Sequence, residues 1–186
     1  HGVKMEAVKY VSTVTDENNS WNGQTRAYGQ VYTTPVVVGQ VMTINDPDWS
    51  VFWAAGSDRT SAPNSTALTV GKHVGEDSDN TRADETIGYI VIETNESGFA
   101  EIEGLRYVAA LGGDTVKGVG DSPAYNYGYN AMPNSKTAVA SQSAMDGGNG
   151  GWAVLYGDNP ITPTGNSLKL AIDEDQRGDP DRWHIS

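Results

Sequence analysis

The feature that most constrains this chain is an internal repeat, because much of the first half of the sequence recurs in the second. Residues 5–12 match residues 102–109 type for type, and residues 49–53 return as residues 152–156. The matched blocks follow one another in the same order in both halves, about 100 residues apart. A period of that length corresponds to a domain rather than to one unit of a solenoid.

Shorter blocks extend the match and set the boundaries of the repeat. They are residues 36–40 and 138–142, 68–70 and 168–170, and 76–77 and 174–175. The sequence therefore predicts two tandem modules, the first at residues 1–97 and the second, diverged one at residues 98–186.

Short apolar runs, cut by glycine, proline, asparagine and aspartate, make up most of both halves. They are rich in β-branched and aromatic residues, and no sustained i, i+3, i+4 pattern of a helix accompanies them. In the first module the expected strands are residues 4–14, 26–32, 36–45, 50–55, 68–74 and 86–93. The pattern predicts an all-β chain of two tandem antiparallel β-sandwich modules, with about six strands each.

The last strand of the first module has no counterpart in the second. Residues 87–92 are apolar throughout, which predicts a central strand covered on both faces. The second copy stops after its acidic loop, so we expect it to lack this strand. Residues following Ser186 in a longer chain would fill the gap, or a strand from a neighbouring copy would fill it and build a head-to-tail polymer.

Composition excludes several classes of partner. The chain has 186 residues, no cysteine and a formal net charge of −12. Such a surface repels phosphate backbones, so nucleic acid is not expected as a partner, and thiol catalysis and disulfides are excluded. No run of about 18 apolar residues is present, so we expect no membrane insertion. No signal peptide is visible, so we expect that a leader was removed or that the chain is part of a longer protein.

Two acidic loops at matching places in the repeat are candidates for binding Ca²⁺, which prefers carboxylate and other oxygen ligands. The candidate ligands are Glu76, Asp77 and Asp79 in the first loop and Asp173, Asp175, Asp179 and Asp181 in the second. Arg177 stands where an EF-hand would have an acid or amide, so this is not that motif. The alternative is a pair of solvated acidic turns, neutralised by Arg82, Arg177 and Arg182.

Aromatic residues supply candidates for stacking on sugars. Tyr125, Tyr127 and Tyr129 alternate, so in a strand their rings would share one face, and Trp49 and Trp152 recur in the repeat. The alternative for such residues is core packing, which we favour for Trp53 and Tyr156. The glycine-rich residues 146–151 predict positive φ angles or a close approach of the backbone, unless the loop is simply flexible.

Catalytic candidates are few. His1 at the amino terminus, with His73 or His184 as a second ligand, is similar to the copper clamp of copper monooxygenases, and this is a remote alternative. The three histidines stand in different contexts, and no Ser–His–Asp set can be assembled from them. We therefore expect a non-catalytic protein.

The first half also resembles a known family. Glu6 in the first strand, residues 35–38, the acidic residues 76–84 and the strand 85–93 occur in the order found in H-type lectin-like modules of large bacterial extracellular proteins. The resemblance implies a six-stranded antiparallel sandwich, frequent trimers and binding of N-acetylgalactosamine-type sugars. The chain lacks the cysteines of the animal members, and their sugar-contacting residues do not map onto it.

These observations lead to one functional hypothesis and two alternatives. The first is a secreted, non-catalytic pair of glycan-binding or adhesion modules on a cell surface. The second is a structural repeat unit of an extracellular filament or surface layer, assembled with neighbouring copies of itself. Copper oxidation is the remote third.

Overall fold

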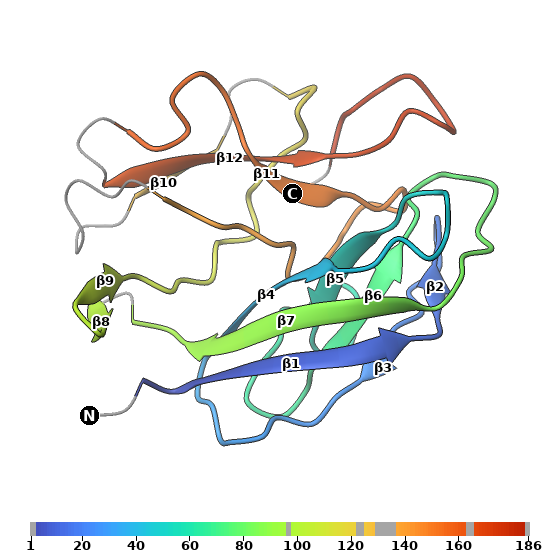
Figure 1. Ribbon diagram of the computed structural model, residues 1–186. Coiled ribbons are helices and arrows are strands. Elements are labelled where there is room, and N and C mark those ends of the chain that lie inside the picture. The colour runs from blue at the N-terminus through green and yellow to red at the C-terminus, as the bar shows by residue number, and fades with distance from the viewer. Residues whose placement is uncertain (1–2, 96–97, 122–124, 129–136, 163–165, 185–186) are drawn as a thin grey trace.

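The computed structural model describes residues 3–95, 98–121, 125–128, 137–162 and 166–184, and these residues form strands without any helix (Figure 1). The expected all-β class is thereby confirmed. The described part of the chain accordingly offers no helix long and apolar enough to cross a membrane.

The first half contains a sheet of three long strands. Its order is β1 (Met5–Ser12), β7 (Glu85–Glu93) and β4 (Pro35–Val41), with both pairings antiparallel. The expected central position of the last strand is confirmed, because β7 pairs with β1 over residues 85–92 and with β4 over residues 87–93.

A second, smaller sheet faces the first. Its central strand is β6 (Thr69–His73), which pairs with β5 (Val51–Ala55) on one edge and with β2 (Thr15–Asp16) and β3 (Gln24–Thr25) on the other. The expected strand at residues 26–32 is wrong, since β3 ends before it.

One apolar core joins the two sheets of the first half. Its buried members are Tyr32, Val37, Phe52, Ala54, Leu68, Val70, Ile87, Tyr89 and Val91. Burying a large apolar side chain contributes about 1.5–3 kcal/mol, so this core is the main source of stability for the first half. Alternate residues of β7 point into it, which is why the first half is a sandwich.

The outer face of β7 is covered at one end only. Ile92 packs there with Val36 and with Ala109 of the second half. Ile90, two residues back on the same face, is 40% exposed. The expectation that β7 is covered on both faces is therefore wrong for much of its length, because the second half reaches only its Ile92 end.

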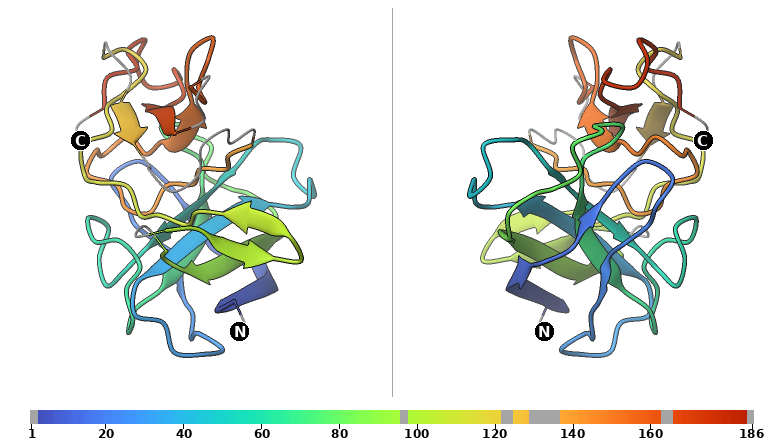
Figure 2. Two further views of the ribbon diagram at one scale, coloured as in Figure 1. Left: turned by 90° about the vertical axis from the view of Figure 1, so that its left-hand side faces the viewer. Right: turned by 90° about the vertical axis from the view of Figure 1, so that its right-hand side faces the viewer.

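The second half repeats the smaller sheet of the first. β12 (Ser167–Asp173) lies between β10 (Tyr125–Gly128) and β11 (Trp152–Leu155), as β6 lies between β3 and β5. An isolated parallel bridge of Gly118 with Ile172 takes the place of the parallel pairing of β2 with β6. In both views of Figure 2 this sheet lies above the strands of the first half.

The larger sheet is not repeated among the described residues. Residues 102–109, which match β1 in sequence, contribute instead to a tight hairpin of β8 (Ala100–Ile102) and β9 (Leu105–Tyr107). Its two turn residues, Glu103 and Gly104, have φ angles of 50° and 84°. A two-residue hairpin with a type I′ turn needs positive φ at both positions, and glycine supplies it where the first half has an alanine.

Residues 138–142 match β4 but form no strand. Their polar groups bind the edges of first-half strands: the Ser141 hydroxyl accepts from the Gly39 amide at 3.0 Å, and the Gln142 carbonyl accepts from the Ala54 amide at 3.3 Å. Among the described residues of the second half, no strand thus occupies the positions equivalent to β7, β1 and β4. What covers the repeated sheet stays a prediction.

The glycine-rich loop at residues 146–151 binds the two halves together. The Gly148 carbonyl accepts from the Asn19 amide at 2.8 Å, and Met145, just before the loop, is buried with Trp53 and Ala55. Gly150 has a φ of 78°, and a Cβ on it would lie 3.0 Å from the His73 ring. The expected close backbone approach is confirmed.

Gly150→Ala tests this contact. We expect the free energy of unfolding to fall by about 3 kcal/mol, because the substitution adds both positive-φ strain and a clash with His73. Gly157→Ala is the matched control: Gly157 has a φ of 90° but open space around it, so only the strain remains, about 1 kcal/mol. Urea titration measures both, and equal losses would contradict the proposed packing role.

Candidate functional site at the joint between the halves

Equivalent residues of the repeat meet at the joint between the halves. The Trp49 and Trp152 rings lie edge to face, with centroids 5.6 Å apart and an interplanar angle of 69°. Trp49 lies just before β5, and Trp152 is the first residue of the equivalent strand β11. These two strands lie near one another. Contact between equivalent residues is the arrangement of an isologous interface, here within one chain. Both candidate tryptophans thus pack on each other.

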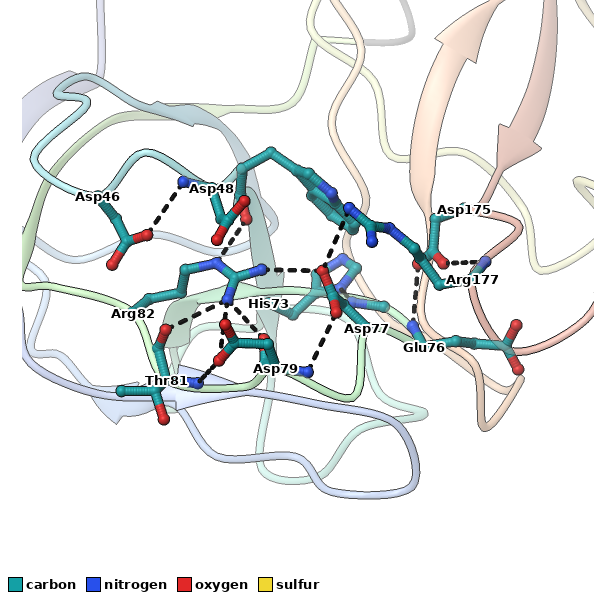
Figure 3. Close-up of polar contacts among 12 residues, drawn as sticks. Asp46, Asp48, His73, Glu76, Asp77, Asp79, Thr81, Arg82, Asp175 and Arg177 are labelled. Atoms are coloured by element: carbon teal, nitrogen blue, oxygen red, sulfur yellow. Dashed lines mark hydrogen bonds and ion pairs between the residues drawn. The ribbon is translucent and has the colours of Figure 1, made fainter.

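In the first acidic loop, an arginine neutralises two of the predicted metal ligands (Figure 3). The buried Arg82 guanidinium lies 3.2 Å from the Asp77 carboxylate and 3.7 Å from that of Asp79. It also donates to the Trp49 carbonyl at 3.0 Å. The hydrogen bond from the Asp79 amide, opposed by burial and aided by the nearby arginines, lowers the pKa of Asp77. Asp77 and Asp79 therefore hold this loop together as ion-paired groups.

Two carboxylates of the second acidic loop also have partners within the protein. Asp173 forms an ion pair with Arg182 at 2.6 Å. Asp175 accepts from the Glu76 amide at 2.9 Å and from the Arg177 amide at 2.8 Å, so it ties the second loop to the first. Arg177 itself reaches back to Asp77, 3.8 Å away (Figure 3).

Glu76 of the first loop lies near several carboxylates of the second loop where the two loops meet. We call Glu76, Glu174, Asp175, Asp179 and Asp181 the acidic cluster. Glu76 accepts from the Asp179 amide at 3.3 Å, and Asp179 accepts from the Asp181 amide at 3.0 Å. Sequence reasoning placed ligands within each loop separately and missed that the joint merges them.

Glu174 is the member of the acidic cluster that sequence reasoning passed over. It is only 6% exposed, and both of its carboxylate oxygens are buried without a hydrogen-bond partner. Burial, followed by the charges of Asp181, Glu76 and Asp179, raises the pKa of Glu174 to about 7. Burial and neighbouring aspartates also raise the pKa of Glu76. The signal in the sequence was the repeat itself, which pairs residue 174 with residue 76.

No three Asp, Glu or His side chains in the described ranges lie close enough together, as they stand, to hold a metal ion. Calcium binding therefore stays a prediction. Its chemical requirement for several oxygen ligands would be met by the acidic cluster only after side-chain rotations.

The tyrosine candidates lie on one face of the repeated sheet. Tyr125 pairs with Leu170 and Tyr127 with Leu168, so their side chains share a face with these leucines, and all four are partly buried. Tyr129 lies outside the described residues. Of the two aromatics expected in a core, Trp53 is buried as expected, but Tyr156 is 37% exposed and that prediction is wrong.

A hollow opens between the halves beside Trp152. It has a volume of about 270 Å³, and its polar lining consists of Gln40, Ser50, Ser141 and Gln142. Gln142 is buried and its side-chain oxygen has no hydrogen-bond partner. A hollow of this size matches a single sugar ring rather than a larger ligand.

The two described histidines both contact the glycine-rich loop. His73 accepts from the Gly75 amide through Nδ1 at 3.1 Å, so its Nε2 carries the proton and donates to the Gly151 carbonyl at 2.8 Å. His184 Nε2 lies 3.2 Å from the Gly150 carbonyl. His1, the anchor of the copper hypothesis, lies outside the described residues. Both nitrogens of His73 are already used in the joint.

Comparison of the chain with protein-family models, with curated proteins and with solved structures finds no match in any of the three. The resemblance to H-type lectin-like modules therefore stays a prediction.

His73 predicts a specific dependence of stability on pH. Burial lowers its pKa to about 4, whereas in the unfolded chain it is about 6.5. The unfolded state then binds the proton first, so stability present above about pH 6.5 is lost as the pH falls towards 4, up to about 3 kcal/mol.

The measurement compares wild type with His73→Gln by urea unfolding across this range. The difference between the two free energies of unfolding cancels the other titrating groups, including Glu174, whose raised pKa acts in the opposite direction. We expect the advantage of wild type to shrink as the pH falls from 7 to 4. A difference that stays constant over this range would show that His73 is not the group responsible.

Proposed function

We propose that this chain is a non-catalytic structural unit of an extracellular assembly, in which copies of the chain pack on one another. The observation that carries the proposal is the outer face of the β1-β7-β4 sheet. Val11, Met42 and Ile90 lie on it, and they are 55%, 52% and 40% exposed. We call these three residues the outer apolar patch.

The outer apolar patch continues a surface that is already used for packing. On the same face, Met5, Val38 and Ile92 are covered by Tyr107, Ala109 and Leu111 of the second half. The chain thus buries one end of this sheet face and leaves the other end exposed. The molecule as a whole is strongly charged, with a formal net charge of −12. Apolar patches of this kind on an otherwise charged surface mark contacts with other proteins.

The edge of the same sheet favours copies of this chain as partners. β1 spans eight residues and pairs only with β7 within the described fold, so most of its other edge is available for strand addition; there the Met5 carbonyl accepts from the Gln30 side chain at 2.8 Å. An exposed strand edge and an exposed apolar face would let copies of the chain join by strand pairing and by apolar packing. Localisation outside the cell is proposed together with this role, from the resemblance to modules of extracellular proteins.

Ile90→Lys tests the association. We expect wild type to self-associate as its concentration rises, and Ile90→Lys to shift the transition at least tenfold higher, because a lysine there puts a charge into the contact. Analytical ultracentrifugation measures both. Val31→Lys is the matched control, since Val31 is 79% exposed and lies in the connection before β4 rather than on a strand of this sheet. A wild type that stays monomeric at all concentrations would contradict the proposal.

A second candidate function, glycan binding, is favoured by the hollow beside Trp152. An aromatic ring with amide and hydroxyl groups around it is the combination that holds a sugar ring. In an assembly of many copies, weak binding at each hollow would add up through multivalency.

A glycan array followed by titration tests this second function. We expect hexosamine or galactose-type glycans to bind each chain with affinity of about 1 mM, and Gln40→Ala to weaken binding at least threefold. Tyr127→Ala serves as the comparison, because Tyr127 lies on the repeated sheet and does not line the hollow. Loss of binding in Tyr127→Ala alone would move the site to the tyrosine face, and an array without hits would contradict the function.

A further inference from the structure

The acidic cluster has a property that an ordinary acidic turn lacks, namely a buried carboxylate without a partner. Glu174 is 94% buried by area, and neither of its oxygens accepts a hydrogen bond. Burial, together with the charges of Asp181, Glu76, Asp179 and Asp175, raises the pKa of this carboxyl group. An unpaired buried carboxylate is costly, so its charge has to be neutralised at this point, by a bound cation or by a proton.

The basic side chains around the joint are already engaged elsewhere. Arg82 pairs with Asp77 and Asp79, Arg177 reaches towards Asp77, and Arg182 pairs with Asp173. Within the described residues, no ion pair includes Glu76, Glu174 or Asp179. The cluster is therefore an excess of negative charge without a basic partner in this part of the chain.

Backbone hydrogen bonds fix several of these carboxylates in place. Asp175 is held by the amides of Glu76 and Arg177, and Asp179 by the amide of Asp181. The carboxylates come from both acidic loops, one in each half of the repeat. The fold thus brings like charges from both loops near one another, and rotation of their side chains would let them share a cation.

We propose that Glu174, Glu76 and Asp179, supported by Asp175 and Asp181, bind a divalent cation that locks the two halves together. Calcium is the ion that this site fits best, because carboxylates on loops adapt to its large and flexible coordination shell. Magnesium demands a tight octahedral geometry that loop carboxylates from two halves supply poorly. The site differs from an EF-hand, since its ligands come from equivalent places in both copies of the repeat.

Thermal unfolding in Ca²⁺ and in EDTA at pH 7.5 tests the site. A ligand that binds only the folded state stabilises it by mass action, so we expect 1 mM Ca²⁺ to raise the Tm by about 5 °C over EDTA. Mg²⁺ at the same concentration should raise it less. Equal Tm values in Ca²⁺ and EDTA would overturn the proposal.

Glu174→Gln separates ligation from a merely structural role. It keeps the shape of the side chain, so we expect it to remove the Ca²⁺-dependent rise and at the same time to raise the Tm in EDTA, because it removes a buried charge. Asp158→Asn, at an exposed acid outside the cluster, should keep the full response. A Glu174→Gln variant that retains the full Ca²⁺ response would place the ion elsewhere and overturn the assignment.

Terbium luminescence gives a second readout that does not depend on stability. Trp49 and Asp175 both lie against Gly75, so Tb³⁺ in the cluster would be close to an indole that can sensitise its emission. We expect emission on excitation of tryptophan, displacement by Ca²⁺, and at least a tenfold loss in Glu174→Gln.

A proton is the competing way to neutralise Glu174. If acidification from pH 8 to 6 stabilises wild type but not Glu174→Gln, while Ca²⁺ neither shifts the Tm nor displaces Tb³⁺, the proton alone satisfies the site and the cation proposal is wrong.

Discussion

The structure of the second half depends on the contact between the glycine-rich loop and His73. Gly150 and Gly151 bring their backbone against a buried imidazole on β6, and a Cβ at Gly150 would lie only 3.0 Å from that ring. This contact places β11 near β5, the Trp152 ring on Trp49, and the second acidic loop against the first. The acidic cluster and the hollow beside Trp152 both follow from that placement.

The repeat explains why charges of one sign meet at the joint. When two copies of a sequence pack with equivalent residues in contact, each side chain faces its own kind. Tryptophan on tryptophan is favourable, whereas glutamate near glutamate is not. Glu76 and Glu174 are such a pair, and the surrounding arginines are committed to other carboxylates. The excess of negative charge at this point thus follows from contact between equivalent positions rather than from a particular loop motif.

The same repeat also shows how similar sequences take different structures. Residues 5–12 form a long strand because β7 lies beside them, whereas residues 102–109 have no such neighbour in the described fold and close into a hairpin at Glu103-Gly104. Likewise, residues 138–142 bind the edges of β4 and β5 instead of forming a strand of their own. Strand formation here depends on a partner, since an isolated strand leaves its backbone groups unpaired.

The sequence by itself determined the all-β class, five of the six strands of the first half, the central position of β7 and the close approach at the glycine-rich loop. Alternating apolar residues and turn residues are local signals, and local signals are enough for these features. Only the tertiary structure decided that Asp77 and Asp173 pair with arginines, that Tyr156 is exposed, and that Glu174 is buried without a partner. Those outcomes depend on which residues about 100 positions apart become neighbours, and no local pattern encodes that.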